Sequence, residues 1–193
     1  MGGFGRSAKM VSITPTRLHW IGDDGEDDPG DYCAHSPVDM RIDGKQVVSP
    51  EDGDWTVSAS AIILLRSLFR NHLTDMKEEE HVFPCCGHGI WPKEGGGVII
   101  SGCPNGIDFC ILHHQGTVEL QIDTEAYDVS YEVWREAVVG FSEEVRRFYV
   151  DAVPKDLSPD AEPEGYIAMM SEWEQLKNQA EQAVPPKSDR AGG

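Results

Sequence analysis

The chain has few basic residues for its length. Sixteen lysines and arginines stand against 34 aspartates and glutamates, which gives a formal net charge of −18 at pH 7. A surface with this excess of carboxylates repels the phosphates of nucleic acids and the head groups of anionic membranes. We therefore exclude both as partners and expect any electrostatically steered partner to be a basic protein.

Long apolar runs are also missing. The longest, residues 61–65, is interrupted at Arg66 and is far shorter than the ~20 residues of a membrane span. The opening residues, MGGFGRSAKMVS, lack the apolar core of a secretory signal. Because the five cysteines form an odd set and no export signal is found, we expect reduced thiols and a cytoplasmic location.

The sequence contains no recognised catalytic signature. The glycines at positions 95–97 lack the lysine and the Ser or Thr of a phosphate-binding loop. The local cysteine motifs of known thiol enzymes are absent as well. These absences favour a binding protein over an enzyme.

The length and composition predict one folded domain. A chain of 193 residues with 39% hydrophobic residues can bury a core without disulfide or metal cross-links. We expect a flexible leader over residues 1–9, a single domain over residues 10–183 and a disordered tail over residues 184–193.

Local patterns predict an α+β fold, in which a mostly antiparallel sheet packs against about three helices. The strongest strand signal is a hairpin of residues 38–42 and 45–49 around an Asp43-Gly44 turn. Apolar residues at helical spacing predict helices over residues 55–73, 130–152 and 164–182, with Ser130 as a cap. Turn signals divide the rest into predicted strands at residues 16–21, 81–84, 98–101, 107–113 and 117–122.

Soft metal ligands and nucleophiles concentrate between residues 81 and 114, which hold four of the five cysteines and four of the seven histidines. Two turns could bring together Cys86, His88 and Cys103, whose sulfur and nitrogen atoms suit zinc. Their spacing is not that of a zinc finger or ribbon. The first alternative is that these cysteines are buried thiols that pack as small hydrophobic side chains, as we expect for Cys110.

A thiol nucleophile is the second alternative for the same segment. Cys86 or Cys103 would need a histidine as base and an acid that orients it, and His88, His113 and Asp108 could supply them in space. Nothing in the spacing fixes that geometry. We rank this hypothesis below zinc, and we expect no cofactor unless zinc is bound.

The densest acidic run is the loop GDDGEDDPGD at residues 22–31, which is punctuated by glycine and proline. We take its first five carboxylates as candidate interaction residues: Asp23, Asp24, Glu26, Asp27 and Asp28. A patch on the last two predicted helices that includes Glu143, Glu144 and Glu172 is equally compatible with the sequence.

Five pieces of sequence, TVSASAIILLRSL, CGH, GCPNGIDF, YEVWREAVVGFSEEVRRFY and GYIAMMSEW, resemble a group of small, acidic, uncharacterised bacterial proteins. The likeness covers residues 38–176 and implies a bacterial, cytoplasmic protein with one domain. The group has no assigned activity. Because some acidic bacterial proteins of this size neutralise basic toxins, charge and size suggest an immunity-like inhibitor by analogy alone. A metal-binding or thiol-dependent protein that uses residues 85–103 is the alternative.

Overall fold

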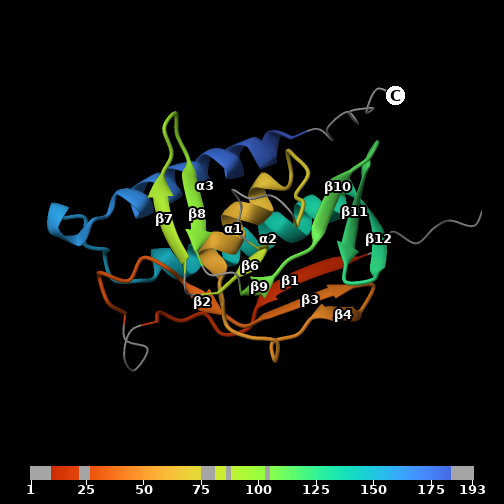
Figure 1. Cartoon of the computed structure of the whole chain (residues 1–193), viewed down its shortest axis with the longest axis horizontal. Coiled ribbons are helices and arrows are strands. Elements are labelled where there is room, and N and C mark those ends of the chain that lie inside the picture. Colours follow the sequence, from red (N-terminus) through yellow and green to blue (C-terminus); the bar gives the residue numbers. More distant parts are fainter. Residues whose placement is uncertain (1–9, 22–26, 75–80, 86–87, 103–104, 184–193) are drawn as a thin grey trace, which may run out of the picture.

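A central helix, α1 (Val57–Arg66), organises the molecule, and the other elements are arranged around it (Figure 1). The computed structural model describes residues 10–21, 27–74, 81–85, 88–102 and 105–183. Nine of the ten residues of α1 are buried. Its small and aliphatic side chains let α2, α3 and β6 approach from several sides.

The two longer helices pack against α1. α2 (Tyr131–Val150) begins after Ser130, whose Oγ accepts a hydrogen bond from the N–H of Val133 at 3.3 Å. This confirms the predicted cap. α3 is Glu164–Gln182, which are the predicted bounds, and a short 3₁₀ helix, η2 (Pro159–Ala161), precedes it.

The strands are antiparallel and form several small sheets. One sheet has the order β1-β3-β4 and another the order β10-β11-β12, and three further pairs are β2-β5, β6-β9 and β7-β8. The bounds are β1 Val11–Pro15, β2 His35–Ser36, β3 Val38–Ile42, β4 Lys45–Val48, β5 Trp55–Thr56, β6 Phe83–Pro84, β7 His88–Pro92, β8 Val98–Gly102, β9 Gly106–Ile107, β10 Cys110–His113, β11 Thr117–Ile122 and β12 Glu125–Ser130.

The β7–β8 hairpin lies across α3 (Figure 1). Ile90 pairs with Ile100, which is fully buried, and their neighbours Trp91 and Ile99 are largely exposed. The hairpin and the helix approach closely at Gly165, where a Cβ atom would collide with the carbonyl of Ile90. A side chain at Gly165 would therefore push the hairpin away from α3.

The predicted α+β class is confirmed: the described residues form one compact domain with antiparallel strands and three α-helices. The hairpin around Asp43-Gly44 is confirmed too, with φ values of 52° and 78° at these two residues. The expected leader and tail lie outside the described residues. None of the described helices is long and apolar enough to cross a bilayer.

Three predicted elements differ in the structure, and one of them, the strand predicted at residues 107–113, is divided into β9 and β10. The strand predicted at residues 16–21 lies earlier, at β1, where Pro15 pairs with Val38 at the strand end. The helix predicted over residues 55–73 is shorter in the structure: residues 55–56 form β5, and α1 runs from Val57 to Arg66. In the turn that follows, the Ser67 hydroxyl donates to the carbonyl of Leu64 at 2.6 Å. Four strands, β2, β5, β7 and β12, were not predicted.

Candidate functional site

The residues predicted as zinc ligands are only partly described. Cys86 and Cys103 lie outside the described residues, and of His88 only the backbone is described, as the first residue of β7. That backbone pairs with the last residue of β8. On the other side of the two cysteines, the N–H of Cys85 donates to the carbonyl of Asn105 at 3.2 Å. The described neighbours of both cysteines are thus paired, and zinc ligation stays a prediction.

Three cysteines are described, and all of them are free thiols: Cys33, Cys85 and Cys110. Burial, reinforced by the charge of Asp31, raises the pKa of Cys33 to about 12, so this thiol is protonated and unreactive at neutral pH. Cys110 is half-buried rather than part of the core, because strand alternation gives the core position to Ile111. Within the described ranges, no three histidine, cysteine or carboxylate side chains meet as a metal site would require.

Two of the three residues proposed to assist a thiol nucleophile, His113 and Asp108, have hydrogen-bonding partners in the structure. The Nε2 atom of His113 lies 2.7 Å from the carbonyl oxygen of Ser67. Asp108 Oδ1 lies 2.8 Å from Nε2 of His72, and this pair is largely buried. Both contacts tie the segment after α1 to the strands around β10. Because Cys86 and Cys103 lie outside the described residues, the thiol nucleophile stays a prediction.

The acidic loop is anchored by one of its own carboxylates. Asp27 accepts hydrogen bonds from the N–H of Val153 at 2.6 Å and from Nζ of Lys155 at 2.8 Å. Burial opposes ionisation of Asp27, but these two donors outweigh it and hold the pKa of the carboxyl below its ordinary value. The carbonyl of Asp28 also accepts from Lys155 Nζ, at 2.9 Å.

Lys155 is the buried cation of this contact. Its side chain is only 4% exposed, and its Nζ lies 3.4 Å from the centroid of the Trp20 ring. The ammonium group therefore combines a cation–π contact with an ion pair to Asp27, and it joins loop 27–31 to the segment after α2.

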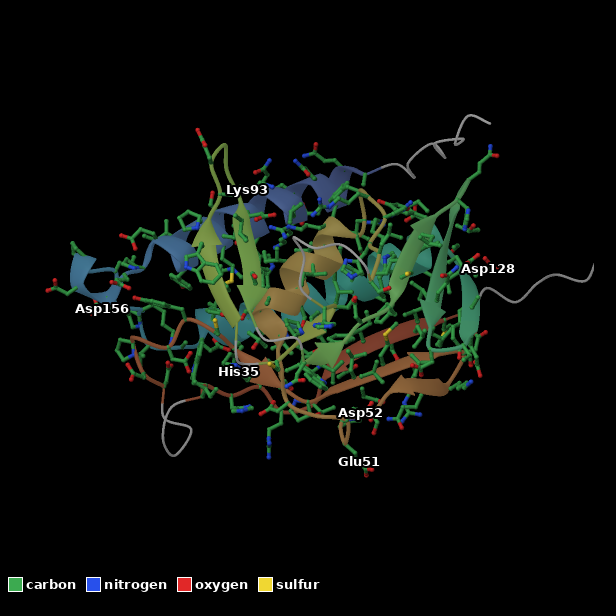
Figure 2. The ribbon with its side chains drawn as sticks, viewed as in Figure 1. His35, Glu51, Asp52, Lys93, Asp128 and Asp156 are labelled. Atoms are coloured by element: carbon green, nitrogen blue, oxygen red, sulfur yellow. The ribbon has the colours of Figure 1, made fainter. Side chains whose placement is uncertain are left out.

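Two acidic segments that are far apart in the sequence meet here, at one end of the molecule. The N–H of Asp156 donates to the carbonyl of Pro29 at 2.9 Å, and the hydroxyl of Tyr32 donates to the carbonyl of Asp156. Figure 2 shows Asp156 at this end and Asp128 at the opposite one. We call residues 27–31 and 150–164 the acidic end. The segment after α2 contributes five carboxylates: Asp151, Asp156, Asp160, Glu162 and Glu164.

Aromatic rings pack against one another next to the acidic end. The rings of Tyr32 and Tyr166 stack with centroids 5.0 Å apart, and Trp20 meets Tyr149 edge to face at 5.1 Å. The hydroxyl of Tyr149 donates to the carbonyl of Tyr32 at 2.7 Å and accepts from the N–H of Ala34 at 3.2 Å. These contacts hold the irregular backbone of the two segments in one arrangement.

Exposed apolar side chains lie among the carboxylates. Val150, Val153 and Leu157 are 69%, 42% and 55% exposed. Next to them, Glu162 has a left-handed backbone with φ of 50°. That conformation is unfavourable for a residue without a short polar side chain, and such strain tends to persist at functional sites.

The alternative acidic patch on α2 and α3 is largely neutralised. Glu172 forms a bidentate pair with Arg66, at 2.7 Å to Nε and 2.9 Å to Nη2, and both side chains are nearly buried. Glu143 pairs with Lys177 at 2.6 Å. The structure therefore leaves fewer free carboxylates on these helices than the sequence suggested, and the acidic end is the stronger candidate.

Near the acidic end, His35 is a buried polar residue of β2. It is 4% exposed, and its Nε2 lies 3.1 Å from Oγ1 of Thr56, the residue before α1. Burial lowers the pKa of His35, although Asp31 and Asp54 act in the opposite direction. The ring is therefore neutral at neutral pH.

The chain matches no known protein family, no curated protein and no solved structure. The candidate site consequently depends on the geometry alone. The sequence identified loop 22–31 as acidic but not the meeting of this loop with residues 150–164, which depends on contacts across more than 120 residues. The available signal was the second acidic, proline-punctuated stretch between the last two predicted helices.

Proposed function

We propose that this protein is a non-enzymatic binding protein whose acidic end docks a basic partner protein, in the manner of an immunity-type inhibitor. The observation that carries the proposal is the contact of Asp27 with Lys155 and Val153, which joins the two acidic segments into one surface. Residues 27–31 and 150–164 contain eight carboxylates and a single lysine, Lys155, which pairs with Asp27.

The charge, the exposed apolar side chains and the ordered backbone of the acidic end all favour a protein partner. A local excess of carboxylates accelerates association with a basic surface and sets its orientation. Exposed apolar side chains beside those charges, such as Val153 and Leu157, can supply the desolvated contacts that slow dissociation. Because aromatic stacking and hydrogen bonds already order the backbone, little conformational entropy would be lost on binding.

The test compares two double variants of equal net charge. The first, Asp151→Lys with Asp160→Lys, changes the acidic end, and the second, Glu51→Lys with Asp128→Lys, changes other surfaces (Figure 2). All four residues are exposed. Basic proteins are captured on immobilised wild-type protein from a lysate of the source organism, purified, and measured for their rate of association.

We expect the first variant to lower the association rate by about tenfold or more at low salt, and the second variant to lower it far less. Added salt should reduce the wild-type rate steeply and the rate of the first variant only weakly. Equal rates for the two variants would show that net charge alone attracts the partner, and the acidic end would lose its assigned role.

Zinc binding by Cys86, His88 and Cys103 is the second candidate function. The pairing of His88 with Gly102 and of Cys85 with Asn105 supports it, because both described flanks of the predicted ligands are held together. Protein purified without chelators should then contain one zinc ion per chain that Cys86→Ser removes and Cys110→Ala retains. Metal-free protein whose melting temperature does not respond to zinc would exclude this function.

A further inference from the structure

A pocket of about 280 Å³ lies at the acidic end, beside the C-terminus of α2. Residues 18–20 and Asp27 line one side of it, and Phe148, Asp151 and Ala152 line the other. Most small-molecule sites are larger, at roughly 300–1,000 Å³. We therefore consider a single long side chain of a partner protein as the occupant.

The end of α2 places an aromatic ring and a carboxylate next to each other. Phe148 and Asp151 are three residues apart, which puts them on the same face of the helix. The half-buried ring of Phe148 packs against Trp20 with centroids 4.7 Å apart, whereas Asp151 is exposed. The ring is therefore held in place, and the carboxylate beside it is open to solvent.

Asp151 is the carboxylate of this pocket that is available to a ligand. The other two charged residues of the lining already have partners: Asp27 pairs with Lys155 at 2.8 Å, and Nε2 of His19 lies 3.0 Å from the carboxylate of Asp54. Within the part of the chain that the structure describes, no basic side chain pairs with Asp151. The lining therefore carries an unbalanced negative charge.

The helix itself adds negative charge at this place. The aligned peptide dipoles of an α-helix give its last carbonyl groups a partial negative charge, which attracts cations. α2 has 20 residues and its C-cap is Asp151. The helix end and the carboxylate therefore both favour a positive charge in the pocket, in line with the net charge of −18 of the whole chain.

The protein binds one of its own cations next to this pocket in the same chemical way. Nζ of Lys155 lies 3.4 Å from the centroid of the Trp20 ring and 2.8 Å from the carboxylate of Asp27. An aromatic face and a carboxylate together thus hold a cation that is almost removed from water. Phe148 and Asp151 offer the same two groups to a cation that comes from outside.

We propose that this pocket takes one arginine side chain of the basic partner, whose guanidinium stacks on Phe148 and pairs with Asp151. Arginine fits better than lysine, because a guanidinium is more weakly hydrated, lies flat on aromatic rings and donates two N–H groups to one carboxylate. An ammonium group is strongly hydrated, and the largely apolar lining would not replace its water. The inference rests on the proposed function, since it names the side chain that the partner brings to the acidic end.

NMR titration of the full ¹⁵N-labelled chain with three blocked tripeptides tests this site without the partner. The peptides are Gly-Arg-Gly, Gly-Lys-Gly and Gly-citrulline-Gly, of which the last keeps the shape of arginine and loses its charge. We expect the arginine peptide to bind with a Kd on the order of 1 mM and to shift the signals of the Asp151 amide and the Trp20 indole. The citrulline peptide should bind about fivefold more weakly or not at all, and the lysine peptide should lie between them.

Two variants of the pocket have matched controls. Asp151→Asn and Phe148→Leu should each weaken binding of the arginine peptide by about threefold or more. Asp128→Asn removes the same charge from an exposed residue at the opposite end of the molecule (Figure 2), and Phe69→Leu makes the same change at an exposed ring outside the pocket. Both controls should leave the affinity unchanged. Should Phe148→Leu fail to fold, the exposed Asp151 still provides the comparison.

The arginine site is overturned if the citrulline or lysine peptide binds as tightly as the arginine peptide, or if Asp128→Asn weakens binding as much as Asp151→Asn. The captured partner separates this failure from a failure of the proposed function. If Asp151→Lys with Asp160→Lys slows association with the partner but the arginine peptide does not bind, the acidic end keeps its role and the arginine site is wrong. If the peptide binds as expected but no basic protein is captured, the pocket is an arginine site and the docking function is wrong.

Discussion

The acidic end and the contact between α1, β8 and α3 each contain one ion pair that joins segments far apart in the sequence. The most buried charge is a cation, Lys155, in the first region and an anion, Glu172, in the second. At the acidic end one buried cation, Lys155, binds Asp27 and joins two chain segments, and the remaining carboxylates face solvent. Where α1, β8 and α3 meet, the nearly buried Glu172 binds Arg66 and the N–H of Val98 and so joins the three elements. In each region an ion pair joins segments that are far apart in the sequence and so fixes the local backbone.

The two regions differ in how deeply the pair is buried. The side chains of Arg66 and Glu172 are 13% and 11% exposed, whereas Asp27 is 25% exposed beside a nearly buried Lys155. The cost of removing one partner rises with burial, because the partner left behind keeps its desolvated charge. This comparison therefore predicts a ranking of variants.

Glu172→Gln should have the largest effect. The substitution keeps the volume but leaves the guanidinium of Arg66 without its carboxylate, and we expect a loss of about 3–5 kcal/mol of unfolding free energy. The matched control is Glu174→Gln on the same helix, because its pair with Arg146 is exposed, at 29% and 49% for the two side chains. The control should lose less than about 1 kcal/mol in denaturant titrations. Similar small losses for both variants would mean that the buried pair does not hold the hairpin.

Lys155→Met should have an intermediate effect. Methionine keeps the apolar stem over Trp20 but loses the ammonium contacts with Asp27 and Asp28. Because Asp27 is partly exposed, we expect a loss of about 1–3 kcal/mol, between the values for surface and buried pairs. In the pair of Lys177 with Glu143 the side chains are 25% and 41% exposed, so neither is as buried as Lys155, and Lys177→Met should lose less than about 1 kcal/mol in the same titration. If Lys155→Met also weakens partner binding while Lys177→Met does not, the contact of Lys155 with Asp27 and Asp28 is needed for the docking surface.

The sequence predicted the elements whose signals are local. The hairpin at β3 and β4, the strand β11 and the bounds of α3 follow from turn residues and periodicity. The sequence could not show which face of α1 is buried, because that helix is buried almost all round and its period carries little information. β12 was missed because charged residues occupy exposed positions along it, as a hairpin at the surface allows.

The candidate sites were less predictable than the fold, for a physical reason. Residues 22–31 were recognised as acidic, but the choice between them and Glu172 depended on which carboxylate meets an arginine. Arg66 follows directly on an apolar run, and nothing in the local sequence indicated that it pairs with Glu172, which is 106 residues further along the chain. Long-range ion pairs depend on the tertiary arrangement, so local spacing could not distinguish a buried structural glutamate from an exposed interaction residue.

The two regions should respond differently to acid. His35 lies near Asp31 of the acidic end and its pKa is lowered by burial, whereas the contact between Arg66, Glu172 and Val98 contains no histidine. The unfolded chain therefore takes up a proton at His35 more readily than the folded chain does. Stability should decline as the pH falls below 6.5, the ordinary value for this group, and the full contribution should be present above it.

His35→Gln removes the titrating ring and can keep a donor near Thr56. We expect the unfolding free energy of this variant to depend less on pH than that of the wild type across that window, as measured in denaturant titrations at several pH values. Parallel pH profiles would show that other groups cause the decline.

Glu162→Gly should have the smallest effect and tests whether the acidic end stores strain. Glu162 is left-handed, with φ of 50°, and such a backbone costs a bulky L-residue roughly 1–2 kcal/mol. Glycine removes that cost but makes the unfolded chain more flexible, by about 0.5–1 kcal/mol, so we expect a net gain of at most about 1 kcal/mol. Asp123→Gly is the control, because Asp123 has a similar φ of 52° in a tight turn but carries a short polar side chain that tolerates it. It should gain nothing or lose stability in the same denaturant titration. If the glutamate variant gains no more than the aspartate variant, the backbone at Glu162 is relaxed, and its conformation gives no support to a binding role for the acidic end.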